Sequence, residues 1–164
     1  MLTSVIRLTI LLCVATAALM ADWKVYIDKK TSPITGLRSA HADLKAKGLG
    51  TATLVVGCND GKSFFRIADQ FRGFNVAPGQ EAQVKLRPST SSEYVEMRAL
   101  ATQTENGVAV LVLDELWPRL LPNLKADTVL LVEMPYQLKV QIATFQIAGL
   151  EGALAKMADA GCRP

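Results

Sequence analysis

Short segments in which apolar and polar residues alternate recur along most of the chain, separated by turn-forming residues. The clearest is AQVKLR, Ala82 to Arg87, in which every second residue is apolar. A period of two places alternate side chains on opposite faces of a β-strand. Further predicted strands are Trp23 to Asp28, Leu37 to Ala46, Thr51 to Cys58, Ser63 to Ala68, Tyr94 to Thr102, Val108 to Leu113, Thr128 to Glu133 and Lys139 to Ile147.

One of these segments also suits a helix. Leu37 to Ala46 is rich in alanine, but short loops flank it, so we prefer the strand. The segments Asn59 to Lys62 and Glu105 to Gly107 are typical of hairpin turns, because Asp-Gly and Asn-Gly tolerate positive φ. Longer loops are predicted at Lys29 to Gly36 and Asp69 to Gly79.

Two short helices are predicted. The first runs from Glu115 to Leu124 after Asp114, a favourable N-cap residue. The second runs from Leu150 to Ala160, where apolar residues recur at the spacing of one helical face. Together these elements predict a mainly β (α+β) fold. We expect an antiparallel β-sandwich or a curled sheet, with the C-terminal helix packed on it.

The first 21 residues resemble a signal peptide, with Arg7 before an uncharged apolar run from Leu8 to Leu19. Cleavage after Ala21 is favoured over cleavage after Ala17, because Asp22 then precedes the first strand. Residues 22–164 form one predicted exported domain, which is periplasmic or secreted. Its only predicted link to a membrane is the signal peptide, and an uncleaved N-terminal anchor is the alternative.

Cysteine number points to the same compartment. Cys13 leaves with the signal peptide, so Cys58 and Cys162 remain. An even count in an exported chain predicts one disulfide bond, and two buried free thiols are the alternative. A metal site is not indicated, since two cysteines and the single His41 provide fewer than the usual four zinc ligands.

No catalytic, cofactor-binding or metal-binding residues are predicted. The chain has no GxSxG motif, and a triad would need His41, which we interpret as an exposed or edge residue. The formal charge of +3 is spread along the chain without a basic block, so nucleic acid is not an expected partner. Phe64 and Trp117 are candidate contacts for a protein partner, or else they fill the core and its edges.

The order of several motifs resembles the periplasmic accessory proteins of type VI secretion systems, the TagO/VasI-like family. The motifs are Trp23 with Ser32-Pro33-Ile34-Thr35, the strand ending in Cys58-Asn59-Asp60-Gly61-Lys62, Pro135-Tyr136, and Thr144 to Leu154 with Cys162. Residues 88–97 lack the Trp-x-x-Ser segment of that family. The resemblance implies a small β-rich domain, a Cys58–Cys162 clamp and an accessory role in the cell envelope.

The sequence therefore predicts a non-enzymatic periplasmic accessory or binding protein, associated with type VI secretion through the resemblance. The expected partner is a protein of the cell envelope. The alternative is a secreted inhibitor or immunity-type protein that acts on an envelope enzyme through loop 69–79 or loop 88–92.

Overall fold

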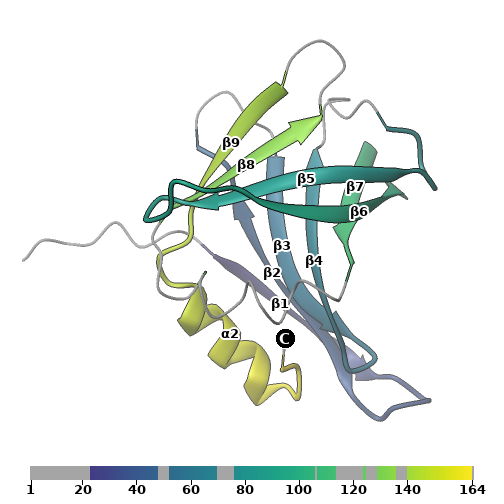
Figure 1. Ribbon diagram of the computed structural model, residues 1–164. Helices are drawn as coiled ribbons and strands as arrows, with labels where there is room; N and C mark the ends of the chain where they lie inside the picture. The colour runs from purple at the N-terminus through teal and green to yellow at the C-terminus, as the bar shows by residue number, and fades with distance from the viewer. Residues whose placement is uncertain are drawn as a thin grey trace, which may run out of the picture.

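The computed structural model describes residues 23–47, 52–69, 76–105, 107–113, 124, 129–135 and 140–163. These residues contain nine β-strands and one complete helix (Figure 1). The elements are β1 (Lys24–Thr31), β2 (Arg38–Lys45), β3 (Ala52–Asn59), β4 (Lys62–Asp69), β5 (Glu81–Pro88), β6 (Val95–Thr104), β7 (Gly107–Val112), β8 (Val129–Pro135), β9 (Val140–Gln146) and α2 (Leu150–Asp159).

All nine strands belong to one antiparallel sheet with the order β1-β2-β3-β4-β7-β6-β5-β8-β9. Strands that follow one another in sequence form three meanders, β1 to β4, β5 to β7, and β8 with β9. The pairs β4–β7 and β5–β8 join these meanders. The curled-sheet alternative is therefore correct, and the described strands do not divide into the two sheets of a sandwich.

The sheet curls until its last strand meets the chain beyond β2. An isolated bridge joins Lys47 to Thr144 of β9, and the Lys47 N–H donates to the Thr144 carbonyl at 2.8 Å. In Figure 1, β5 and β6 cross in front of β3 and β4. This curl makes one face of the sheet concave, and we call it the inner face.

Apolar residues of alternating positions fill the inner face. Because side chains alternate along a strand, the core residues of β3 are Leu54, Val56 and Cys58, whereas Val55 and Gly57 point to the outer face. The largest fully buried side chains are Phe65, Phe145, Leu54, Ile67, Leu86, Met97, Leu124, Leu130, Ile147 and Leu150.

Helix α2 completes the core. It begins after Gly149, whose φ of 87° favours a residue without a Cβ, and it packs against β1 and β2. Its buried residues are Leu150, Ala153, Leu154 and Met157, so the predicted apolar stripe is confirmed. The other predicted helix, Glu115 to Leu124, lies outside the described residues except for Leu124, which is helical and buried.

The predicted Asp60-Gly61 hairpin is confirmed, with φ values of 50° and 77° at the two turn residues. The prediction of a loop from Lys29 is wrong, because β1 continues to Thr31 and pairs there with Arg38 after an irregularity. Exposed lysines continue this strand, so no apolar alternation marked its second half in the sequence.

The predicted signal peptide, residues 1–21, lies outside the described residues. Within the part of the chain that the structure describes, no helix has the length and apolar character needed to cross a membrane.

Candidate functional site

A disulfide bond joins Cys58 of β3 to Cys162, which follows α2. The two Cα atoms are 5.7 Å apart and the residues are 104 positions apart in sequence. Both cysteines are almost fully buried, at 2% and 0% exposure. The predicted bond is thus confirmed, and it anchors the end of the helix to the third strand of the sheet.

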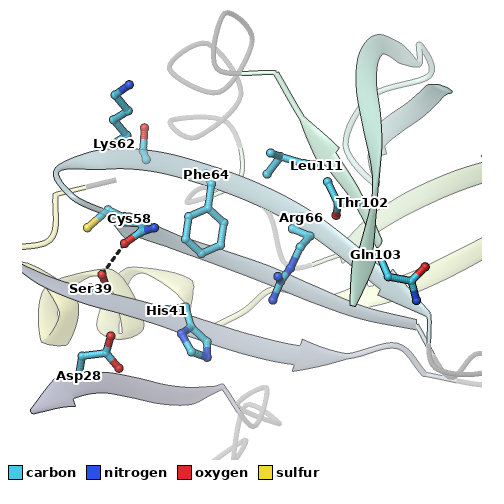
Figure 2. Close-up of a pocket in the computed structure, with 12 residues that line it drawn as sticks. Asp28, Ser39, His41, Cys58, Lys62, Phe64, Arg66, Thr102, Gln103 and Leu111 are labelled. Atoms are coloured by element: carbon cyan, nitrogen blue, oxygen red, sulfur yellow. Dashed lines mark hydrogen bonds between the residues drawn. The ribbon is translucent and has the colours of Figure 1, made fainter. Parts of the chain in front are cut away.

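The outer face of the same region carries an open hollow of about 710 Å³ (Figure 2). Pockets that bind small ligands fall in this size range. Strands of the first two meanders supply its walls. The lining residues are Asp28, Ser39, His41, Cys58, Asn59, Lys62, Ser63, Phe64, Arg66, Thr102, Gln103 and Leu111.

One row of outer-face residues runs across four strands and contains three rings. The register pairs Tyr26 with His41, His41 with Gly57, and Gly57 with Phe64. The rings of Tyr26 and His41 stack, with centroids 4.9 Å apart and an angle of 23° between their planes. Glycine occupies the position between His41 and Phe64, so no side chain separates these two rings within the row.

The glycine is required by the packing of its neighbours. A Cβ at Gly57 would lie 2.8 Å from both the His41 Cβ and the Phe64 Cζ, and it would also meet the Ala40 carbonyl oxygen. The tip of the Phe64 ring therefore occupies the space over Gly57. This arrangement lays Phe64 across β3, where it forms part of the floor of the hollow (Figure 2).

A second row lies two residues further along each strand and carries charge. The register pairs Asp43 with Val55, Val55 with Arg66, and Arg66 with Leu111. Val55 is 2% exposed. Asp43 and Arg66 flank it from either side, and each has one atom shielded from solvent without a hydrogen-bond partner, Oδ1 of Asp43 and Nε of Arg66.

Burial raises the pKa of the Asp43 carboxyl above its ordinary value. The nearby charges of His41, Arg66 and Lys24 act in the opposite direction but do not cancel the effect of burial. The Asp43 Oδ1 lies 3.9 Å from Nε2 of His41. Asp43 is therefore a carboxyl whose ionised form the fold disfavours, next to the hollow.

The polar side chains in the hollow form defined hydrogen bonds. The Ser39 hydroxyl donates to the Asn59 Oδ1 at 2.6 Å, so it is directed away from His41. The Gln103 Nε2 donates to the carbonyls of Thr104 and Gly107, both at 3.1 Å. Among the described residues, no group of three or more His, Cys, Asp or Glu side chains could hold a metal ion.

Of the two predicted contact residues, Phe64 lies half-buried in the hollow, and Trp117 lies outside the described residues. His41 is not an edge residue, because β2 lies between β1 and β3. Its side chain is 40% exposed, in agreement with the other alternative, although its ring stacks on Tyr26. Sequence reasoning did not identify Arg66 or Gln103. Arg66 lies near Phe64 on the same strand, and Gln103 reaches the hollow only through the β4–β7 and β6–β7 pairings.

Fold and site define a mainly β domain of one curled sheet, clamped by a buried disulfide and hollowed on its outer face. Its fold is similar to the crystal structure of invasion associated protein B from Bartonella henselae. The TM-score is 0.57 at 15% sequence identity, and the match covers 85% of this chain and 94% of that one. At this identity the match supports the fold alone. No family model and no curated protein matches the sequence.

Proposed function

We propose that this chain is a non-enzymatic binding protein of the extracytoplasmic space, periplasmic or secreted, and that a protein partner docks in the outer hollow. The observation that carries the proposal is the composition of that hollow. Phe64 and Arg66 lie side by side in it, and arginine and aromatic residues provide much of the binding energy of protein interfaces.

The disulfide supports the compartment. Disulfides persist mainly in oxidising environments, whereas cytosolic thiols are kept reduced. The bond is buried at both ends and holds the helix against the sheet. Such a clamp suits a scaffold that presents a fixed surface outside the cytoplasm.

Site-specific photocrosslinking tests the docking face. A photoreactive amino acid replaces Gln103, an exposed residue of the hollow, in the protein expressed in its own cells. The matched control places the same group at Glu151, which is exposed on α2 and does not line the hollow. We expect a discrete crosslinked protein from position 103 and none of the same mass from position 151.

Equal crosslinking from both positions, or none from position 103, would contradict docking in the hollow. Mass spectrometry of the product then separates the predicted roles. A secretion-system subunit would support the type VI association that the sequence resemblance implies. A single cell-wall enzyme would instead favour the inhibitor alternative. Of the two loops predicted to act in that role, loop 69–79 has residues 70–75 outside the described residues.

A further inference from the structure

We infer that the outer hollow recognises a carboxylate on an acidic peptide segment, and that Arg66 is the residue that receives it. This inference rests on the proposed function, because it names the chemistry of the partner at the same site. Four observations support it. They concern the contacts of Arg66, the charges around it, the apolar side chains of Phe64 and Leu111, and the side-chain amides of Asn59 and Gln103.

The Arg66 side chain contacts the Phe64 ring, and one of its N–H donors, Nε, has no acceptor. Its guanidinium carbon lies 5.9 Å from the centre of the Phe64 ring, and its Nε is shielded from solvent without a hydrogen bond. A buried donor that lacks a partner costs free energy. A carboxylate matches the planar fork of arginine and can accept two parallel hydrogen bonds from it.

The charged residues that line the hollow are mostly cationic. Asp43 faces Arg66 across Val55 and the charge of Arg66 acts on it, but Asp43 does not line the hollow and the structure describes no ion pair between the two side chains. Within the lining, Lys62 and Arg66 are cationic and Asp28 is anionic. The lining therefore has a positive balance that an acidic segment would complement.

The rest of the hollow suits a peptide. Phe64, two residues from Arg66 on β4, and Leu111, its pairing partner on β7, are apolar, so an apolar residue next to the acid would contact them. The Gln103 Nε2 donates to backbone carbonyls, and among the described residues its Oε1 has no donor, so it can accept from a peptide N–H. Asn59 accepts from Ser39 through Oδ1, and within the described part of the chain its Nδ2 has no acceptor, so it can donate to a peptide carbonyl.

The test is a titration of the purified, isotopically labelled protein followed by nuclear magnetic resonance. Three probes are compared: a blocked pentapeptide with glutamate between two leucines, its glutamine counterpart, and a leucine peptide ending in a free carboxylate. We expect the glutamate probe to shift the amide signals of Phe64, Arg66 and Gln103. The glutamine counterpart should bind about tenfold more weakly, since a charge-assisted bond is lost.

The third probe identifies the source of the carboxylate. Stronger binding of the free-carboxylate peptide would assign the site to a chain terminus, and stronger binding of the glutamate peptide would assign it to an acidic side chain. Only preference for the glutamate peptide supports the inference, and preference for the free terminus would overturn the acidic segment as the occupant.

Variants test the role of Arg66. Arg66→Gln should weaken binding of the preferred carboxylate probe by about tenfold, and Arg66→Lys should retain part of the affinity, because lysine keeps the charge without the fork. Arg87→Gln is the matched control. Arg87 stands over the Tyr94 ring at 5.2 Å, in an arrangement like that of Arg66 and Phe64, but it does not line the hollow. Its replacement should leave the affinity unchanged.

Equal binding of the glutamate and glutamine peptides would overturn the inference. This comparison uses the natural protein, so its result does not depend on whether a variant folds. Stronger shifts of the same signals by a uronic acid oligosaccharide would also overturn it, in favour of an acidic sugar. The crosslinking and titration experiments together distinguish failure of this inference from failure of the proposed function. A protein crosslinked from position 103 without carboxylate dependence would leave the docking face intact and remove only the peptide chemistry.

Discussion

At the scale of single residues, Gly57 links the stability of the sheet to the shape of the hollow. A methyl group there would collide with backbone on one side and with His41 and Phe64 on the other. We expect Gly57→Ala to lower the free energy of unfolding by about 1–3 kcal/mol through overpacking. Urea unfolding would measure this loss, and the nuclear magnetic resonance signals of the Phe64 and His41 rings should shift with it.

Gly152 provides the control for that prediction. It lies in α2, and a Cβ at this position would meet no atom within 4 Å. Gly152→Ala should therefore raise the free energy of unfolding by about 0.5–1 kcal/mol, because alanine has the higher helix propensity. If Gly57→Ala and Gly152→Ala had the same free energy of unfolding, crowding at Gly57 would not affect the stability of the sheet.

Asp43 makes a prediction about pH. Burial raises its folded-state pKa above the ordinary aspartate pKa of about 3.8, so the native state binds a proton more tightly than the unfolded state does. Ionisation of Asp43 therefore destabilises the fold as the pH rises from about 3.8 through the folded-state pKa. Asp43→Asn should be more stable than the natural protein at pH 7, and the advantage should disappear below the unfolded-state pKa.

Thermal unfolding at neutral and acidic pH would check this sign. A variant that is less stable at pH 7 but equally stable in acid would show instead that the charges of His41, Arg66 and Lys24 outweigh burial.

The sequence predicted the disulfide and the candidate Phe64, but it did not predict the role of Arg66. The cysteine pairing followed from parity and compartment, and it is present in the fold. Phe64 was identifiable as a candidate because adjacent strand residues lie on opposite faces, and the structure shows that Phe65 is the one that faces the core. Arg66 was not identifiable, since a cation on a strand is usually solvated, and only the register places it across Val55 from Asp43.

At the scale of elements, the disulfide connects β3 with the end of α2 and closes a loop across most of the sheet. The chain-entropy model assigns a loop of this length about 4–5 kcal/mol. Replacing both cysteines, in Cys58→Ala/Cys162→Ala, should lower the free energy of unfolding by up to this amount. Equilibrium urea unfolding measures it, and the natural protein under reducing conditions is the control.

A loss below about 1 kcal/mol would indicate that the buried face of α2 holds the helix without the bond. That face includes Leu150 and Met157, each at most 1% exposed.

Most strands lie within a few residues of their predicted bounds, because alternation and turn residues mark them strongly. The second strand, Leu37 to Ala46, was ambiguous in sequence, and it forms β2, since its small residues Ala40 and Ala42 face the core. The second half of β1 was missed because it is exposed on nearly every residue. A strand is marked by periodic burial, so one that buries little leaves no signal.

At the scale of the whole molecule, the sequence allowed either two stacked sheets or one curled sheet. Alternation reveals which side of a strand is buried, but not which strand lies next to it. The β4–β7 and β5–β8 pairings join strands that are not consecutive in sequence. The bridge between Lys47 and Thr144 depends on both pairings, and no local pattern encodes it.

The β4–β7 pairing has a consequence for the energetics of binding. The hollow lies across this boundary, with Phe64 and Arg66 on the first meander and Gln103 and Leu111 on the second. A ligand that contacts both meanders binds only when they are paired. Its binding free energy therefore adds to the free energy needed to separate β4 from β7. At a concentration one hundred times its dissociation constant, this linkage amounts to about 2.7 kcal/mol. An occupant of the hollow would thus act as a non-covalent cross-link between two parts of the sheet that no disulfide connects.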